Sequence, residues 1–229
     1  MSIVDQLKAS GVKALCLDMN GTFIFEHDRF DSGADLAVCY RGLGGRGGQD
    51  EVEAACLGLI TQLELLYREP EHNLDFPSVQ DVAASIVPDH LDVDALVQTI
   101  SIHEMGRLSE DNHRALTRLK DDFELIVISN LWSDAAMIRD YLATELSPDF
   151  FRVMVFSSDM GVNKPAVEIF LHALKLADVG VSESAMVGDD LYRDIDPAHS
   201  LGMQTIHLGA GSSTLGNADY AAVDLSGLF

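Results

Sequence analysis

Positive charge is scarce in this sequence. Its 229 residues include 15 lysines and arginines against 37 aspartates and glutamates, which gives a formal net charge of −22 at pH 7. A chain this acidic is poorly suited to bind the phosphate backbone of nucleic acids or an anionic membrane surface, because both would repel it. We therefore expect neither nucleic acid nor membrane as a partner. An anionic substrate would have to be met locally, by a metal ion or by a few basic side chains.

Cysteine is also rare, and long apolar runs are missing. The three cysteines, Cys16, Cys39 and Cys56, are odd in number and show no paired spacing, which indicates neither a disulfide framework nor a zinc site. No apolar stretch approaches the length of a membrane span, and the first residues lack the basic and apolar segments of a signal peptide. These features predict a cytoplasmic protein, and its length allows a substantial core. We expect a monomer or a homodimer.

The most informative stretch is residues 14–22. Its apolar first half is typical of a strand buried on both faces of a parallel sheet, and it ends abruptly at Asp18. Open α/β sheets bind ligands at the carboxyl ends of their strands, so Asp18 lies where a reactive carboxylate is expected. Asn20 and Gly21 then predict a tight turn. A simple hairpin remains an alternative here, with residues 23–25 as the returning strand.

Three later segments place polar residues after an apolar run or near the start of a helix. They are Ser129-Asn130, Lys164 before Pro165, and Gly188-Asp189 with Asp194. Each is ordinary when taken singly: a serine after a strand often forms a turn, a lysine near a helix start is usually solvated, and paired aspartates favour a helix N-terminus. Four segments in this order, at domain-scale spacing, are a strong combined signal for a carboxylate nucleophile with its supporting groups.

The combination resembles the haloacid dehalogenase-like (HAD) hydrolase superfamily, most of whose members are magnesium-dependent phosphatases. The first motif of that family, Asp-x-Asp-x-Thr, is matched at Asp18 and Thr22, but its second aspartate is replaced by Asn20. The later motifs are matched by Ser129, by Lys164 and by the Gly-Asp-x-x-x-x-Asp of residues 188–194. The resemblance covers nearly the whole chain, and its one departure falls on a catalytic position.

This resemblance implies a doubly wound parallel α/β sheet, a Rossmann-like core, with an all-helical cap inserted after the first motif. The sequence agrees, because strand-like and helix-like runs alternate after residue 125, whereas residues 26–119 show only helical patterns. We expect a core of residues 1–25 and 120–229 and a cap of residues 26–119. The predicted helices are residues 2–10, 52–63, 79–86, 93–105, 133–146, 165–177 and 191–201, and the later strands are residues 125–129, 153–156, 185–187, 205–208 and 220–223.

By the same resemblance, Asp18 is the nucleophile that attacks phosphorus and forms an aspartyl-phosphate, which water later hydrolyses. The expected cofactor is Mg²⁺, a cation that prefers oxygen ligands. Its ligands would be the carboxylates of Asp18 and Asp189 and the main-chain carbonyl of Asn20. Asp194 would orient Lys164 or a metal-bound water, and Asp190 is the alternative for this role.

The phosphate group is expected to meet a second set of residues. Lys164 would neutralise the nucleophile and a phosphoryl oxygen, while Ser129 and the backbone near Asn130 would donate hydrogen bonds. Thr22 is assigned to the phosphate site as part of the first motif.

Basic residues are few in the predicted cap, so Arg41 and Arg46 are candidate substrate contacts. The glycine-rich residues 42–48 superficially resemble a phosphate-binding loop, but no strand precedes them and we interpret them as a cap loop. Three further residues are assigned to packing or to the surface rather than to catalysis: His27, His103 and Trp132.

Asn20 limits the functional prediction. In the phosphatases of the family, the aspartate at this position protonates the leaving oxygen and then activates water, a role worth roughly 10²–10⁴ in rate. The leading prediction is a Mg²⁺-dependent phosphatase of a small phosphorylated metabolite, slowed by Asn20. The alternatives are a haloacid dehalogenase-type hydrolase that uses Asp18 without metal, and a catalytically impaired protein that binds phosphate and metal. Asp189 and Asp194 favour the first, because a dehalogenase needs no metal site.

Overall fold

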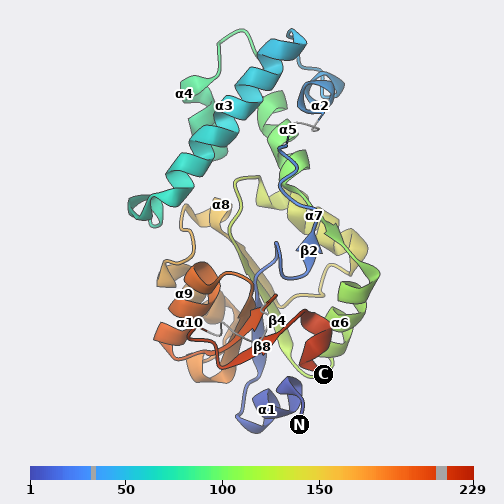
Figure 1. Cartoon of the computed structure of the whole chain (residues 1–229), viewed down its shortest axis with the longest axis vertical. Helices are drawn as coiled ribbons and strands as arrows, with labels where there is room; N and C mark the ends of the chain where they lie inside the picture. Colours follow the sequence, from blue (N-terminus) through green and yellow to red (C-terminus); the bar gives the residue numbers. More distant parts are fainter. Residues whose placement is uncertain (32–34, 210–215) are drawn as a thin grey trace.

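The computed structural model describes residues 1–31, 35–209 and 216–229 (Figure 1). Its main sheet has six strands in the order β5-β4-β1-β6-β7-β8, and every neighbouring pair is parallel. The strands are β1 (Ala14–Leu17), β4 (Glu124–Ser129), β5 (Val153–Phe156), β6 (Ser184–Gly188), β7 (Gln204–Leu208) and β8 (Tyr220–Ala222). The predicted doubly wound α/β fold is confirmed, with the first predicted strand at the centre of the sheet.

Helices cover both faces of this sheet. Strand side chains alternate between the faces, so each face presents apolar side chains that a layer of helices buries. Leu15 and Leu17 belong to one apolar layer, with helices α1 (Ile3–Ala9), α6 (Glu110–Lys120) and α7 (Ala135–Glu145). Ala14 and Cys16 belong to the other, with α9 (Val167–Ala177) and α10 (Asp196–Leu201), which lie on the opposite side in Figure 1. Cys16 is fully buried, and this burial raises the pKa of its thiol to about 12, so it acts as a core residue.

Four helices form a second, helical unit beyond the carboxyl ends of the strands (Figure 1). They are α2 (Leu36–Gly42), α3 (Gln49–Arg68), α4 (Val79–Ile86) and α5 (Val93–Glu104). The unit has an apolar cluster of its own, in which Leu59, Leu63 and Leu96 are fully buried. The Asp92 side chain caps α5 by accepting a hydrogen bond from the N–H of Ala95 at 3.0 Å.

The packing of α6 differs from the predicted extent of the cap. Leu116 and Leu119 fall within residues 26–119, yet they are buried in the layer that covers the main sheet. No helix was predicted over residues 110–120, so its place in the layer on the sheet was not foreseen. We propose that the cap ends before α6.

A short antiparallel ribbon connects the two parts of the molecule. It pairs β2 (Ile24–Phe25) with β3 (Arg107–Leu108). The simple hairpin alternative is therefore wrong, because β2 pairs with a segment after the helical unit and not with β1. No strand was predicted between residues 26 and 119, because two residues are too few to show a pattern.

Smaller elements complete the description. Helix α9 begins at Val167, so Pro165 lies before it in a loop, not in its first turn, and the peptide between Lys164 and Pro165 is cis. The predicted helix at residues 191–201 is a π-helical turn (Leu191–Ile195) followed by α10. The remaining short helices are α8 (Ser157–Met160) and the 3-10 turns Pro70–His72, Val181–Glu183 and Leu225–Leu228. Within the described ranges, no helix combines the length and apolar character that a bilayer crossing requires.

Candidate active site

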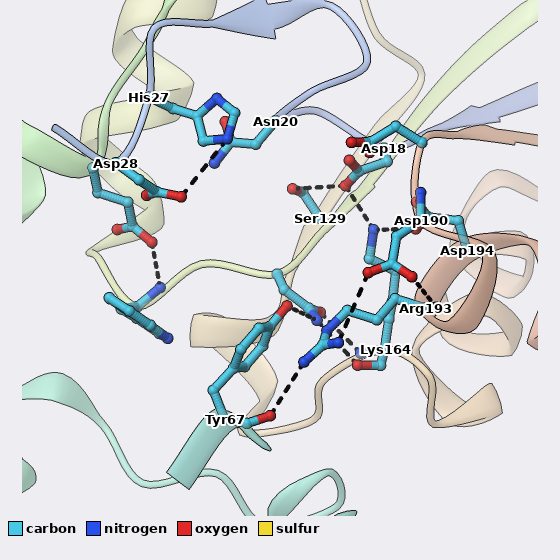
Figure 2. Close-up of a pocket in the computed structure, with 14 residues that line it drawn as sticks. Asp18, Asn20, His27, Asp28, Tyr67, Ser129, Lys164, Asp190, Arg193 and Asp194 are labelled. Carbon is cyan, nitrogen blue, oxygen red and sulfur yellow. Dashed lines mark hydrogen bonds and ion pairs between the residues drawn. The ribbon is translucent and has the colours of Figure 1, made fainter. Parts of the chain in front are cut away.

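Three strand ends meet at one pocket (Figure 2). Asp18 directly follows β1, Ser129 ends β4, and Asp189 directly follows β6. Because β1 lies between β4 and β6 and all three run parallel, their carboxyl ends carry these side chains to the same edge of the sheet. The sequence predicted this convergence correctly.

Lys164 is the electrostatic centre of the pocket, with only 3% of its surface exposed. Its Nζ lies 2.6 Å from Oδ1 of Asp18 and 2.6 Å from Oδ1 of Asp194, both of which are also buried. Burial by itself lowers the pKa of Lys164, but the two carboxylates outweigh this effect and hold the pKa above its ordinary value. Lys164 is therefore a permanent cation beside the candidate nucleophile.

Asn130 and Ser129 hold the two reacting groups in place. The Asn130 side chain accepts a hydrogen bond from the N–H of Lys164 at 2.8 Å and donates one to the carbonyl oxygen of Lys164 at 3.0 Å. The hydroxyl of Ser129 donates to Oδ1 of Asp18 at 3.1 Å. Since Lys164 bonds to the same oxygen, Oδ2 of Asp18 is the oxygen that is left to react.

Asp189 lies against the turn that follows Asp18. Its carboxylate and those of Asp18 and Asp194 place one oxygen each within 4.8 Å of one another. Burial, followed by the charge of Asp18, raises the pKa of Asp189 to about 6. Gly21 permits this approach, since it has a φ of +81° and a Cβ there would lie 2.3 Å from Oδ2 of Asp189.

The donor set fits a hard divalent cation. Three carboxylates face one lysine, so the site carries an excess of negative charge, and oxygen donors are the ligands that Mg²⁺ prefers. Asp18 and Asp189 are the residues whose carboxylates would hold it. Both oxygens of Asp194 are in use, because Oδ1 contacts Lys164 and Oδ2 accepts the N–H of Asp190 at 3.2 Å.

Asp194 thus contacts Lys164, as the sequence predicted, whereas Asp190 does not serve as its substitute. Asp190 instead caps the π-helical turn, where its Oδ1 accepts the N–H groups of Tyr192 at 2.8 Å and Arg193 at 3.1 Å. Asp190 fixes the start of the segment that carries Asp194 and Arg193.

Arg193 and Tyr67 join the core to the helical unit at this pocket, and sequence analysis missed both. The Arg193 guanidinium lies over the Tyr67 ring, 4.0 Å from its centroid, and donates to the Tyr67 carbonyl oxygen at 3.2 Å. The Tyr67 hydroxyl accepts a hydrogen bond from Asn130 at 2.9 Å. A basic residue inside the fourth motif was the available signal for Arg193; the sequence has no comparable signal for Tyr67.

Glu104, the last residue of α5, ties the helical unit to the loop after β4. Its carboxylate accepts the N–H groups of Trp132 at 2.8 Å and Ser133 at 2.9 Å and the Ser133 hydroxyl. Complete burial raises the pKa of Glu104 to about 8. The carboxyl group thereby fixes Trp132 at the pocket wall.

Two of the three residues assigned to packing or to the surface also line the pocket: Trp132 and His27, which Figure 2 labels. His103 does not, and its packing role is confirmed, because its ring is buried between the Thr99 carbonyl at 2.8 Å and the Asp35 carboxylate at 3.1 Å. His27 was missed because its position depends on how the helical unit docks.

Three of the predicted substrate and phosphate contacts lie outside the pocket. Arg41 and Arg46 are exposed and do not line the pocket; α2, which contains Arg41, lies at the far end of the helical unit (Figure 1). Thr22 is buried and does not line the pocket, and within the described part of the chain its hydroxyl has no hydrogen-bond partner. Asn20 does line the pocket, and its Oδ1 is buried without a partner among the described residues.

Known proteins share parts of this sequence and the whole of this fold. Glyceraldehyde 3-phosphate phosphatase of Pyrococcus furiosus is 36% identical over 112 residues, which is 49% of this chain and 43% of the relative. The enzyme of the same name from Pyrococcus abyssi is 47% identical over 58 residues, 25% of this chain and 24% of the relative. The matches thus span less than half the length of these curated relatives.

Solved structures match over more of the chain at lower identity. A HAD phosphatase from Thermococcus onnurineus superposes with a TM-score of 0.64 at 23% identity, covering 94% of this chain and 95% of that one. A 2-haloacid dehalogenase from Pseudomonas syringae pv. tomato gives a TM-score of 0.59 at 20% identity, with coverage of 94% and 95%. These likenesses show the fold alone. The family model of haloacid dehalogenase-like hydrolases matches residues 12–202, a range that contains every motif residue at the pocket, and the chain belongs to this family of hydrolases.

Proposed function

We propose that this protein is a magnesium-dependent phosphatase that forms an aspartyl-phosphate on Asp18. The observation that carries the proposal is the charge balance of the pocket. Lys164 is shared between Asp18 and Asp194, and a third carboxylate, Asp189, lies beside them. An attack by a carboxylate on a phosphate anion needs further positive charge, which a divalent cation supplies when bound.

The residues of the chain have distinct tasks in this reaction. Lys164 and Ser129 fix Oδ1 of Asp18, so that Oδ2 is free to attack phosphorus. The carboxylates of Asp18 and Asp189 and the main-chain carbonyl of Asn20 would hold the metal. The Lys164 ammonium and the polar groups around Asn130 would then stabilise the charge on the transferring phosphoryl group.

The substrate class is supported by the relatives of the chain and by its net charge. We propose a small phosphorylated metabolite, acted on in the cytoplasm by a protein that acts as a monomer or a homodimer. The partial similarity to glyceraldehyde 3-phosphate phosphatases supports a small phosphate ester. The net charge of −22 argues against nucleic acid.

The test is phosphate release from a panel of phosphorylated metabolites and an aryl phosphate, with Mg²⁺ and with a chelator. The proposal predicts turnover that requires Mg²⁺ and falls to background in Asp18→Asn, a replacement of nearly the same size. Halide release from 2-haloacids in the presence of chelator would instead establish the dehalogenase alternative. This alternative is included because of Asn20 and because a dehalogenase shares the fold. Binding of Mg²⁺ and phosphate without turnover of any ester would establish the binding-protein alternative.

A further inference from the structure

We propose that His27 supplies the proton transfer that Asn20 cannot perform. The inference rests on the proposed phosphatase function, and it names an acid and base for that reaction. An amide at position 20 neither gives nor takes a proton near neutral pH, whereas an imidazole does both. His27 would therefore make the site a working phosphatase rather than an impaired one.

The first support is the geometry around Asn20. Figure 2 shows the Asn20 side chain directed toward the His27 ring, and both residues line the pocket. Nδ1 of His27 and Oδ1 of Asn20 are both buried, and within the described residues neither has a hydrogen-bond partner. Buried polar atoms are nearly always paired, so two such atoms at one pocket indicate that a water or a substrate oxygen completes them.

The second support is that the segment around His27 is held in an unusual conformation. Glu26 and Asp28 flank the histidine and both have a positive φ, of 58° and 53°. Backbone strain of this kind persists where the surrounding structure imposes it, and it clusters at functional sites.

Neighbouring segments impose the conformation. The N–H of Asp28 donates to the Glu104 carbonyl at 3.3 Å, and the N–H of Arg29 donates to the His103 carbonyl at 2.9 Å. A Cβ at Gly106 would lie 2.5 Å from the Phe25 carbonyl oxygen and 3.1 Å from Cβ of His27, so the chain packs closely here. His27 is therefore positioned by the junction between the core and the helical unit.

The third support is that two other proton-carrying groups at the pocket, Lys164 and Glu104, are bonded to other residues. Lys164 is bonded to two carboxylates, and both oxygens of Glu104 accept hydrogen bonds from the loop after β4. Asp28 lies 3.7 Å from Nε2 of His27 through its Oδ2, with its side chain 52% exposed, so it is placed to orient the ring. Among the described residues that line the pocket, His27 is the one imidazole, and we assign the proton transfer to it.

The proposed steps balance in atoms and charge. In the first, Oδ2 of Asp18 bonds to phosphorus, the bond from phosphorus to the leaving oxygen breaks, and protonated His27 gives its proton to that oxygen. In the second, water bonds to phosphorus and the bond to Asp18 breaks. The proton of the water passes to the now neutral His27, which regenerates both residues.

The test compares phosphate monoesters whose leaving groups range from activated aryl to unactivated alkyl. A general acid matters for alkoxide leaving groups and hardly at all for nitrophenolate, so His27→Gln should lower kcat/KM for alkyl esters by roughly 10²-fold or more while that for the aryl ester stays within about threefold. Asn20→Asp in the His27→Gln background should restore the alkyl esters. The matched control is His90→Gln, which removes another histidine paired with a carboxylate, at 2.7 Å from Glu51 and outside the pocket.

The outcomes separate this inference from the function on which it rests. Suppose that wild type hydrolyses the esters with Mg²⁺, but that His27→Gln lowers kcat/KM equally for alkyl and aryl esters or lowers it for neither. His27 is then structural, and the inference is overturned while the phosphatase function stands. If wild type hydrolyses no ester, both are overturned. His27→Asn provides a second variant, and circular dichroism checks that each variant is folded; the inference predicts the same leaving-group pattern from both.

Discussion

The two walls of the pocket are built on different principles. On the sheet wall, Asp18, Lys164 and Asp194 are buried, and their charged atoms contact one another at 2.6 Å. On the opposite wall, Nδ1 of His27 is a buried polar atom that no described residue satisfies. On the sheet wall, folding pairs Lys164 with two carboxylates, whereas on the opposite wall the polar atom of His27 is left for what enters the pocket. The predictions that follow test this contrast.

The largest effect is expected from breaking the sheet wall. Lys164→Met leaves two buried carboxylates without their cation, which should cost about 3–5 kcal/mol of the free energy of unfolding. Urea denaturation measures it. Lys175→Met is the control, because Lys175 is exposed on α9 and its loss should change stability little. Equal stability of the two variants would show that Lys164 does not compensate the buried charge.

A metal ion should stabilise the same wall. At a hundredfold excess over its dissociation constant, Mg²⁺ should add about 2.7 kcal/mol to the free energy of unfolding, because it binds the folded state alone. Asp189→Asn should abolish the shift, whereas Asp190→Asn should retain it, since Asp190 caps a helical turn. Thermal unfolding with and without Mg²⁺ distinguishes the two; loss of the response in both variants would contradict this assignment of the ligands.

Glu104 should give the junction with the helical unit a pH-dependent stability. Burial raises its pKa from an ordinary value of 4.5 to about 8, so between these values the folded state holds a proton that the unfolded chain releases. The contribution of Glu104 to the free energy of unfolding should therefore fall as pH rises from about 5 to about 8. Glu104→Gln should flatten that fall in urea titrations across this range. An unchanged slope would mean that Glu104 is ionised when folded.

The smallest effect separates an arginine of the core at the pocket from an arginine of the helical unit outside it. Arg193 lines the pocket and its Nε is buried without a partner among the described residues, so Arg193→Ala should raise KM for phosphorylated substrates about tenfold. Arg41→Ala should leave KM unchanged, because Arg41 is exposed outside the pocket. Steady-state kinetics on one ester would decide, and a larger effect at Arg41 would restore the original prediction for the cap arginines.

The contrast between the walls also explains what the sequence could predict. Asp18, Ser129 and Asp189 end parallel strands, and chain order with strand alternation determines which strand ends meet. Lys164 and Asp194 were recognisable by their spacing from those strands.

The opposite wall depends on docking, which leaves no periodic signal. His27 reaches the pocket through a strained turn, and Trp132 is held there by Glu104 from a distant helix. Arg41 and Arg46 show the same limit. They were selected because basic residues are rare in the predicted cap, but the sequence does not reveal that they lie outside the pocket. Helix α6 was not predicted; most of its residues were assigned to the cap, whereas Leu116 and Leu119 pack in the layer on the sheet.

The most direct test of the central claim is to trap the phosphoryl group. Enzyme turning over an aryl phosphate with Mg²⁺ is quenched in acid and mapped by peptide mass, which also verifies that Asn20 has not deamidated to aspartate before the adjacent glycine. The account predicts a phosphoryl adduct on Asp18 that requires Mg²⁺, is absent from Asp18→Asn and accumulates in His27→Gln, because its hydrolysis by water is then slow. Metal-dependent turnover with no adduct, or with an adduct on another residue, would contradict it.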